Sequence, residues 1–185
     1  MNTNIIQALP AAATPFLRID GVKPVNWCRN VQSGPRFGPW SFEAVFTVLD
    51  GKTWQREGEV IYFVTDGAGR LRLVGESGGR LKDRWRLSPM HDVQTHAPLG
   101  RKALFHSTAW GAIERGLSDE APPFVVSALF SDALARVLMA HGAMASLPQT
   151  ADHLCRRTEE AILTHLGSGA GLWNKKGVRA APLAV

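Results

Sequence analysis

Hydrophobic and polar positions form their clearest pattern over residues 59–75. Residues 59–65 are a β-branched and aromatic run, which predicts a buried strand. Residues 70–75 alternate between polar and aliphatic side chains, which predicts a second strand that is buried on one face. The segment between them, Asp66–Gly69, contains two glycines and is typical of a tight turn. This part of the chain is therefore predicted to be a β-hairpin.

Four further segments have patterns clear enough to assign. They are a short basic helix at 80–87, a strand at 124–130, and helices at 131–141 and 151–166. Residues 109–117 predict another short helix, and residues 41–49 fit either a strand or a short helix. Residues 1–20 show no periodicity, so we expect them to fray or to lie along the surface.

These elements predict an α/β (α+β) fold, in which a small central antiparallel sheet of about three strands is flanked by helices. We expect residues 1–57 to be an N-terminal extension packed on the core, and residues 58–178 to be the main domain. That domain includes an insertion at about 88–122. Residues 179–185 are expected to be a C-terminal tail.

Composition narrows the class of protein. Of the 185 residues, 45% are hydrophobic and 20% are charged, which is the composition of a folded globular domain. No run of 18 apolar residues exists and the N-terminus lacks the pattern of a signal peptide, so we expect no membrane association. The two cysteines, Cys28 and Cys155, match no disulfide or metal framework, which favours a cytoplasmic location.

The charge balance points to the kind of partner. Lysine and arginine number 21 against 16 acidic residues, a formal net charge of +5. A basic chain favours a polyanionic partner, although charge alone leaves nucleic acid, anionic lipid and simple solubility open.

Three short motifs follow one another in the main domain: Val60-Ile61-Tyr62, Leu73-Val74-Gly75 and Leu81-Lys82-Asp83-Arg84. Together they resemble the start of a GIY-YIG nuclease domain. Val60-Ile61-Tyr62 stands for the first motif and Leu73-Val74-Gly75 for the second, with Val and Leu in place of its Gly and Tyr. Leu73 comes eleven positions after Tyr62, and Arg84 comes nine after Gly75, which is close to the spacing in the family. A later helix with Glu159 and a basic loop at Asn174 follow in the family's order, so the resemblance covers residues 58–178.

The resemblance implies an endonuclease that depends on one divalent cation, Mg²⁺ or Mn²⁺. In such an enzyme Glu159 holds the metal, Tyr62 handles the attacking water, and Arg84 steadies the phosphate. The helix pattern also favours Glu159 over its neighbour, because Glu159 borders the predicted buried face. Glu160 is flanked by Arg156 and other polar residues on the solvated side.

Several other residues are candidates for the same site. His91 and His106 are rival candidates for a proton carrier, since the family's helix histidine is replaced by serine here. Five residues are predicted to contact the substrate: Arg80, Gly75, Asn174, Lys175 and Lys176.

The sequence therefore predicts an endonuclease that hydrolyses phosphodiester bonds in DNA, with DNA favoured over RNA, and with a role in restriction or defence as one possibility. A homodimer is a possible assembly. Two alternatives stay open. One is a nucleic-acid-binding module of the same fold whose catalytic site has decayed with the loss of the second tyrosine. The other is an adaptor that binds a protein through its tryptophan-rich front segment.

Overall fold

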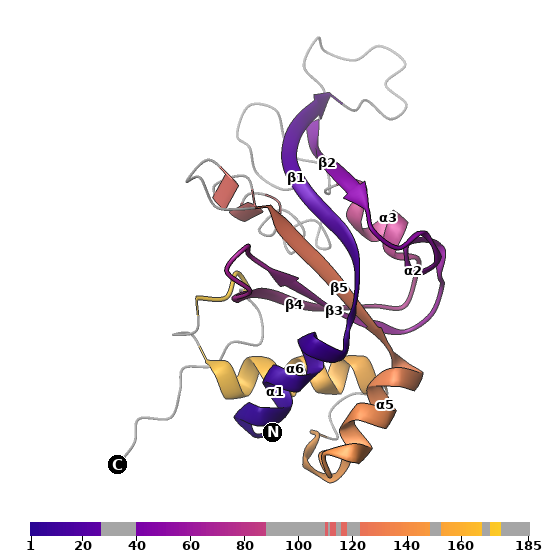
Figure 1. The fold of residues 1–185 in the computed structure, drawn as a ribbon, viewed down its shortest axis with the longest axis vertical. Coiled ribbons are helices and arrows are strands. Elements are labelled where there is room, and N and C mark those ends of the chain that lie inside the picture. Colours follow the sequence, from indigo (N-terminus) through magenta and orange to yellow (C-terminus); the bar gives the residue numbers. More distant parts are fainter. Residues whose placement is uncertain are drawn as a thin grey trace.

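A computed structural model describes residues 1–26, 40–87, 110, 112–113, 116–117, 123–148, 153–167 and 171–174. Within them, five strands form one antiparallel sheet in the order β2-β1-β5-β3-β4 (Figure 1). The strands are β1 (Thr14–Asn26), β2 (Trp40–Val48), β3 (Val60–Thr65), β4 (Leu71–Ser77) and β5 (Phe124–Phe130).

Helices cover both faces of this sheet. They are α1 (Thr3–Ala12), α2 (Gly51–Gln55), α3 (Leu81–Trp85), α5 (Ser131–Ala140) and α6 (Leu154–Leu166), with a 3₁₀ turn at Met144–Ser146. Helices α1, α5 and α6 gather at one end of the molecule in Figure 1, against residues of β3, β4 and β5. Helices α2 and α3 pack on the other face. None of the described helices is long and apolar enough to cross a bilayer.

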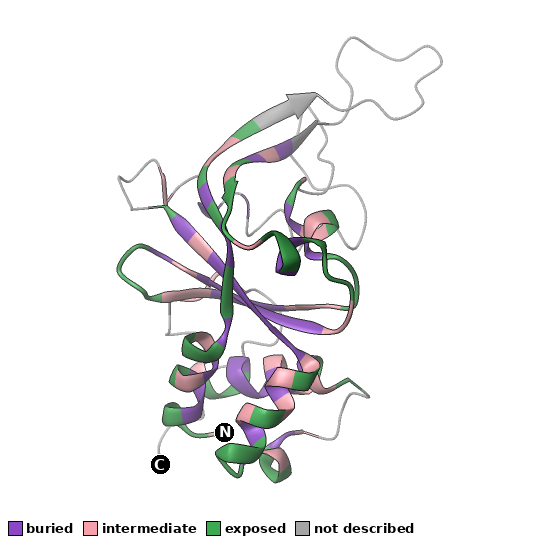
Figure 2. Ribbon diagram, turned by 45° about the vertical axis from the view of Figure 1, so that its right-hand side comes forward, coloured by how far each residue is buried: buried purple, intermediate pink, exposed green. Residues whose placement is uncertain are grey.

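Successive residues of a strand point to opposite faces of the sheet, so the buried residues form two clusters, one on each face. Ile61 and Phe63 of β3 pack toward α1, α5 and α6. Tyr62 and Val64 pack on the opposite face, in the same cluster as residues of α2 and α3. As Figure 2 shows, burial follows the central strands while the outer sides of the helices are exposed.

The hairpin, the strand at β5 and the helices α3, α5 and α6 confirm the corresponding predictions from the sequence. The predicted class, helices around an antiparallel sheet, is also confirmed. The expected number of strands was wrong, because the sheet has five strands rather than about three.

The two additional strands come from the N-terminal part of the chain. Residues 1–20 were expected to fray or to lie along the surface, yet they form α1 and the first seven residues of β1. Strand β1 lies between β2 and β5, and its residues Phe16, Leu17 and Ile19 are fully buried. Its pairing shifts register twice, between Pro15 and Leu17 on one side and after Ile19 on the other. Such bulges interrupt the period-two alternation by which strands are recognised in a sequence.

Candidate active site

Tyr62 lies at the centre of the candidate site. It is in the middle of β3, opposite Gly75 of β4 and Ala128 of β5, and only 1% of its surface is exposed. Its hydroxyl oxygen accepts two hydrogen bonds from the guanidinium of Arg84, from Nε at 3.1 Å and from Nη2 at 2.8 Å. Burial raises the pKa of Tyr62, although the charge of Arg84 opposes this effect. The phenol therefore keeps its proton at neutral pH and acts as a hydrogen-bonding group.

Arg84 is held by a short helix whose other residues are anchored in the core. On α3 its neighbours Leu81 and Trp85 are buried, while Arg84 itself is half-buried. The ring of Trp85 meets Tyr62 edge-on, with 5.2 Å between ring centroids. This packing fixes the helix against Tyr62, so the guanidinium is held in one place by its two hydrogen bonds.

Gly75 provides the space that the Tyr62 ring occupies. A Cβ atom at Gly75 would lie 2.3 Å from both Cζ and Oη of Tyr62. The ring therefore crosses directly over the backbone of β4 and brings its hydroxyl toward the edge strand of the sheet. This is a structural reason for glycine here that is separate from the predicted contact with substrate.

We expect Gly75→Ala to destabilise the protein by about 1–3 kcal/mol or more, the usual cost of overpacking a core. The clash is with a fully buried ring rather than with a flexible side chain. The matched control is Gly78→Ala, where an added Cβ meets nothing within 4 Å. Urea unfolding of the two variants measures the difference. Equal stability of both would show that the Tyr62 ring is not fixed over β4.

Glu159 lies on α6, which packs on the other face of the sheet, yet its charge acts on both Tyr62 and Arg84. Its carboxyl group is half-buried, and burial, together with the negative charge of Glu76, raises its pKa to about 7. The positive charges of Arg84 and Arg156 act in the opposite direction. The charges of Glu159 and Glu76 also act on Tyr62. Side chains from β3, β4, α3 and α6 thus form one electrostatically coupled group.

Glu159 and Glu160 are both half-buried, but they have different charged neighbours. The buried residues of α6 are Cys155, Thr158, Ala161, Ile162 and Leu163. Glu160 forms a surface ion pair with Arg156, at 3.5 Å. The sequence pattern predicts a buried face of Leu154, Thr158, Ala161, Ile162, His165 and Leu166. Part of this prediction was wrong, because His165 is exposed, with its ring nitrogen 3.3 Å from the Thr3 hydroxyl oxygen, and Cys155 is buried.

The raised pKa of Glu159 predicts a pH-dependent stability. Between about pH 4.5 and 7 the folded protein holds a proton that the unfolded chain has released, so this group's contribution to stability falls as the pH rises through that window. We expect Glu159→Gln to exceed the wild type in stability by on the order of 2–3 kcal/mol at pH 8 and to match it below pH 4.5.

Urea unfolding at the two pH values in EDTA measures this effect. The control is Glu160→Gln, for which we expect no comparable gain at pH 8. A Glu159→Gln variant that is less stable than the wild type at pH 8 would contradict the assignment of a destabilised carboxylate.

Glu159 and Glu76 both carry carboxyl groups, and carboxylate oxygens are suitable ligands for a divalent cation. Mg²⁺ is commonly bound by one or two carboxylates together with water and substrate phosphate. Two mutually repelling carboxyl groups on half-buried residues are stabilised when a cation lies beside them. Among the described residues no group of three or more histidine, cysteine, aspartate or glutamate side chains could hold a metal ion. Protein ligands alone would therefore fill only part of the coordination shell.

Asn174 is buried, and its side chain forms hydrogen bonds with the edge strand β4. Its side-chain oxygen accepts a hydrogen bond from the backbone N–H of Val74 at 3.1 Å, and its amide nitrogen donates to the Val74 carbonyl at 2.7 Å. The backbone N–H of Trp173 donates to the carbonyl of Arg72 at 2.7 Å. The segment 171–174 therefore covers the edge of β4 next to Gly75. Both polar ends of the amide are used in this way, rather than facing outward toward a phosphate.

The remaining candidates lie outside this group or outside the described residues. Arg80 forms an exposed ion pair with Glu57 at 3.0 Å. Four predicted residues are not among those that the structure describes: His91, His106, Lys175 and Lys176.

Glu76 is the site residue that sequence reasoning missed. It follows Gly75 on β4, at a half-buried position opposite Ile61. Its strand parity places it on the same face as Val74, toward α6. A charged residue at an inward-facing position of an alternating strand was the available signal.

Cys155 lies one helical turn before Glu159 and is a free, buried thiol. Burial, with the charges of Glu59 and Glu76, raises its pKa to about 12. A thiol that stays protonated is neither a nucleophile nor a metal ligand at neutral pH. This cysteine therefore contributes packing.

No protein-family model, curated protein or solved structure matches this chain.

Proposed function

We propose that this chain is a metal-dependent endonuclease that hydrolyses phosphodiester bonds in DNA, by chemistry of the GIY-YIG type. The observation that carries the proposal is the hydrogen-bonded pair of Tyr62 and Arg84, on which the charge of Glu159 acts. Three elements far apart in sequence contribute these residues, and the two hydrogen bonds from Arg84 to Tyr62 join two of them directly. The order of elements, hairpin, α3, β5 and α6, is the order that the resemblance implies.

The proposed reaction is in-line attack of water on phosphorus. The water oxygen forms a bond to phosphorus and one proton of the water passes to a base. The bond from phosphorus to the leaving oxygen breaks, and that oxygen takes up a proton from solvent. Arg84 balances the charge that grows on the phosphate oxygens, because its guanidinium is already oriented by Tyr62. Tyr62 holds its proton and orients the water by a hydrogen bond. His91 and His106 are the candidate proton acceptors.

Glu159, with Glu76 beside it, would hold Mg²⁺ or Mn²⁺. Such an ion supplies positive charge to the phosphate and lowers the pKa of bound water. With that charge in place the raised pKa of Glu159 returns toward the ordinary range, since a cation favours the ionised carboxylate. The carboxylate that burial destabilises is thus the one that a bound metal ion would stabilise.

A nucleic-acid-binding module without catalysis is the second candidate. One observation favours it: Leu73, where the family has a tyrosine, is 2% exposed and belongs to the apolar core. That position therefore supplies no hydroxyl to the site.

Incubation of supercoiled plasmid, and of duplex, single-stranded and branched oligonucleotides, with Mg²⁺, Mn²⁺ or EDTA separates the two. The endonuclease gives nicked or linear products only with the metal. Salt-sensitive binding without products under any metal condition identifies the binding module. The absence of both binding and cleavage would contradict both candidates.

A further inference from the structure

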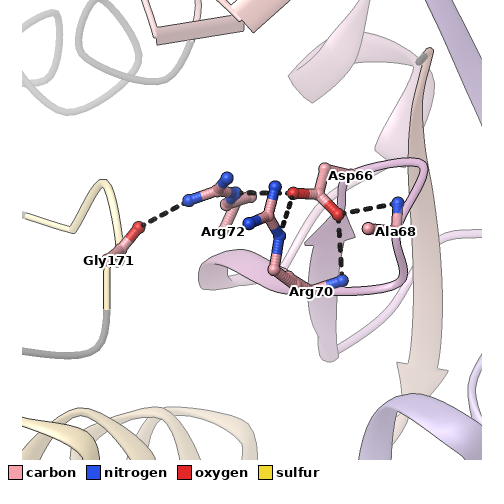
Figure 3. A network of polar contacts seen from close by, with 5 residues as sticks. All are labelled: Asp66, Ala68, Arg70, Arg72 and Gly171. Carbon is pink, nitrogen blue, oxygen red and sulfur yellow. Dashed lines mark hydrogen bonds and ion pairs between the residues drawn. The ribbon is translucent and has the colours of Figure 1, made fainter. Parts of the chain in front are cut away.

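The turn between β3 and β4 holds a buried carboxylate with two arginines (Figure 3). The Asp66 side chain is 2% exposed, and each of its oxygens accepts two hydrogen bonds. Oδ1 accepts from the backbone N–H groups of Ala68 and Arg70, both at 3.0 Å. Oδ2 accepts from Nε of Arg70 at 2.8 Å and from Nε of Arg72 at 3.0 Å. Against the effect of burial, these bonds hold the pKa of Asp66 below its usual range.

This arrangement leaves an excess of positive charge at the turn. One carboxylate faces two guanidinium groups, and both reach it through Nε rather than through their terminal nitrogens. Arg72 uses a terminal nitrogen on the carbonyl of Gly171, at 3.5 Å. The guanidinium of Arg70 has no further hydrogen bond among the described residues, and the side chain is 68% exposed. Its two terminal nitrogens therefore face solvent while Nε is anchored.

An anchored, outward-facing guanidinium is suited to bind phosphate. A long, flexible side chain loses conformational entropy when it binds a ligand. Arg70 has lost much of that entropy already in the folded protein, because its Nε is fixed on the buried carboxylate of Asp66. Stabilising the turn requires only Nε and the backbone groups. The exposed side of Arg70 is thus unused by the fold.

Arg70 lies at a suitable distance from the candidate active site. It precedes Gly75 by five residues, roughly 16 Å along an extended chain. Phosphates of one DNA strand follow each other about every 3.4 Å along the helix axis, so this distance corresponds to several nucleotides. The pairing of Asn174 and Trp173 with β4 fixes the strand between the two places.

We propose that Arg70, oriented by Asp66, binds a backbone phosphate of the nucleic-acid substrate several nucleotides from the cleaved bond. This inference rests on the proposed function, because it takes a nucleic acid as the substrate. It adds a substrate contact at the hairpin turn that the catalytic residues do not provide. A phosphate contact of this kind positions the duplex and carries no sequence information of its own.

The test measures binding of a fluorescein-labelled 30-base-pair duplex by Glu159→Gln protein, across a range of salt concentrations. Addition of Arg70→Gln is expected to weaken binding several-fold and to reduce the slope of log K against log salt by about 0.9, the value for one lost phosphate contact. The control is Arg136→Gln on α5, whose side chain is 69% exposed and also paired with an aspartate four residues away. The control is expected to leave the slope unchanged.

An unchanged slope for Arg70→Gln, or an equal reduction for Arg136→Gln, would overturn the proposal. Should Arg70→Gln fail to fold, Arg70→Lys decides, because lysine keeps a charge for Asp66 but lacks the guanidinium fork. We expect Arg70→Lys to bind the duplex about 2–5-fold more weakly than the Glu159→Gln parent, with the same slope of log K against log salt. An affinity equal to that of the parent would contradict the proposed phosphate contact.

The same experiment separates this inference from the proposed function. A parent that binds no duplex overturns both. Binding with a slope that depends on Arg70, by a protein whose wild type cleaves nothing, supports the contact and overturns only the endonuclease.

Discussion

Glu159→Gln protein is expected to fold, to bind DNA as tightly as the wild type or more tightly, and to lose metal-dependent cleavage. Glutamine has nearly the same shape but carries no negative charge with which to hold a divalent cation. Loss of that charge stabilisation in the transition state should cost on the order of 10³ in rate or more. Affinity is kept because the substitution removes a negative charge from beside the phosphate. Single-turnover cleavage and a separate binding assay measure the two effects.

Glu160→Gln is the matched control for this experiment. It is the next residue on α6, it is also half-buried, and it pairs with Arg156 on the helix surface. We expect it to cleave at close to the wild-type rate. An inactive Glu160→Gln together with an active Glu159→Gln would show that the metal-binding carboxylate has been assigned to the wrong face of the helix.

Tyr62→Phe is expected to fold and to bind DNA, yet to cleave about 10²-fold more slowly or worse. Phenylalanine keeps the ring over Gly75 and its edge contact with Trp85, at 5.2 Å between centroids. It removes the oxygen that accepts two hydrogen bonds from Arg84. Bonds to a charged group are worth roughly 1.5–3 kcal/mol, so a stability loss of that order accompanies the change. The loss in rate follows because the guanidinium and the water are no longer held in position.

A comparison of kcat with KM distinguishes positioning from simple packing. We expect Tyr62→Phe to lower kcat while KM changes little. Arg84→Lys, which keeps the charge but not the paired donors, should reproduce much of this loss. Cleavage by Tyr62→Phe at close to the wild-type rate would show that Tyr62 only packs, and the proposed chemistry would then depend on His91 or His106.

The local elements could be predicted from the sequence because their signals are local. Strand β3 is a continuous apolar run, β4 alternates, and a glycine-containing turn joins them; α6 ends at Gly167, whose φ is +62°. The buried face predicted for α6 was close to the observed one, and Glu160 forms the predicted surface ion pair with Arg156. Strand β1 could not be found in this way, because bulges break its alternation and one of its two partners, β5, lies far along the chain.

The contacts of the site depend on residues distant in sequence, and a single sequence does not show these. Asn174 bonds to Val74, 100 positions away, and so stabilises a strand edge rather than facing outward toward a phosphate. The place of Glu76 beside Glu159 follows from the packing of α6 on β4. The close approach of Tyr62 to Gly75 likewise becomes visible only when the hairpin is paired.

The most direct test of the central claim is single-turnover cleavage of end-labelled duplex DNA by wild-type protein, with Mg²⁺ and with EDTA. Glu159→Gln protein purified in parallel serves as the blank. The account predicts shortened, labelled fragments only from the wild type and only with the metal. Fragments formed equally by Glu159→Gln protein, or no fragments with either Mg²⁺ or Mn²⁺, would contradict the claim that this site hydrolyses phosphodiester bonds.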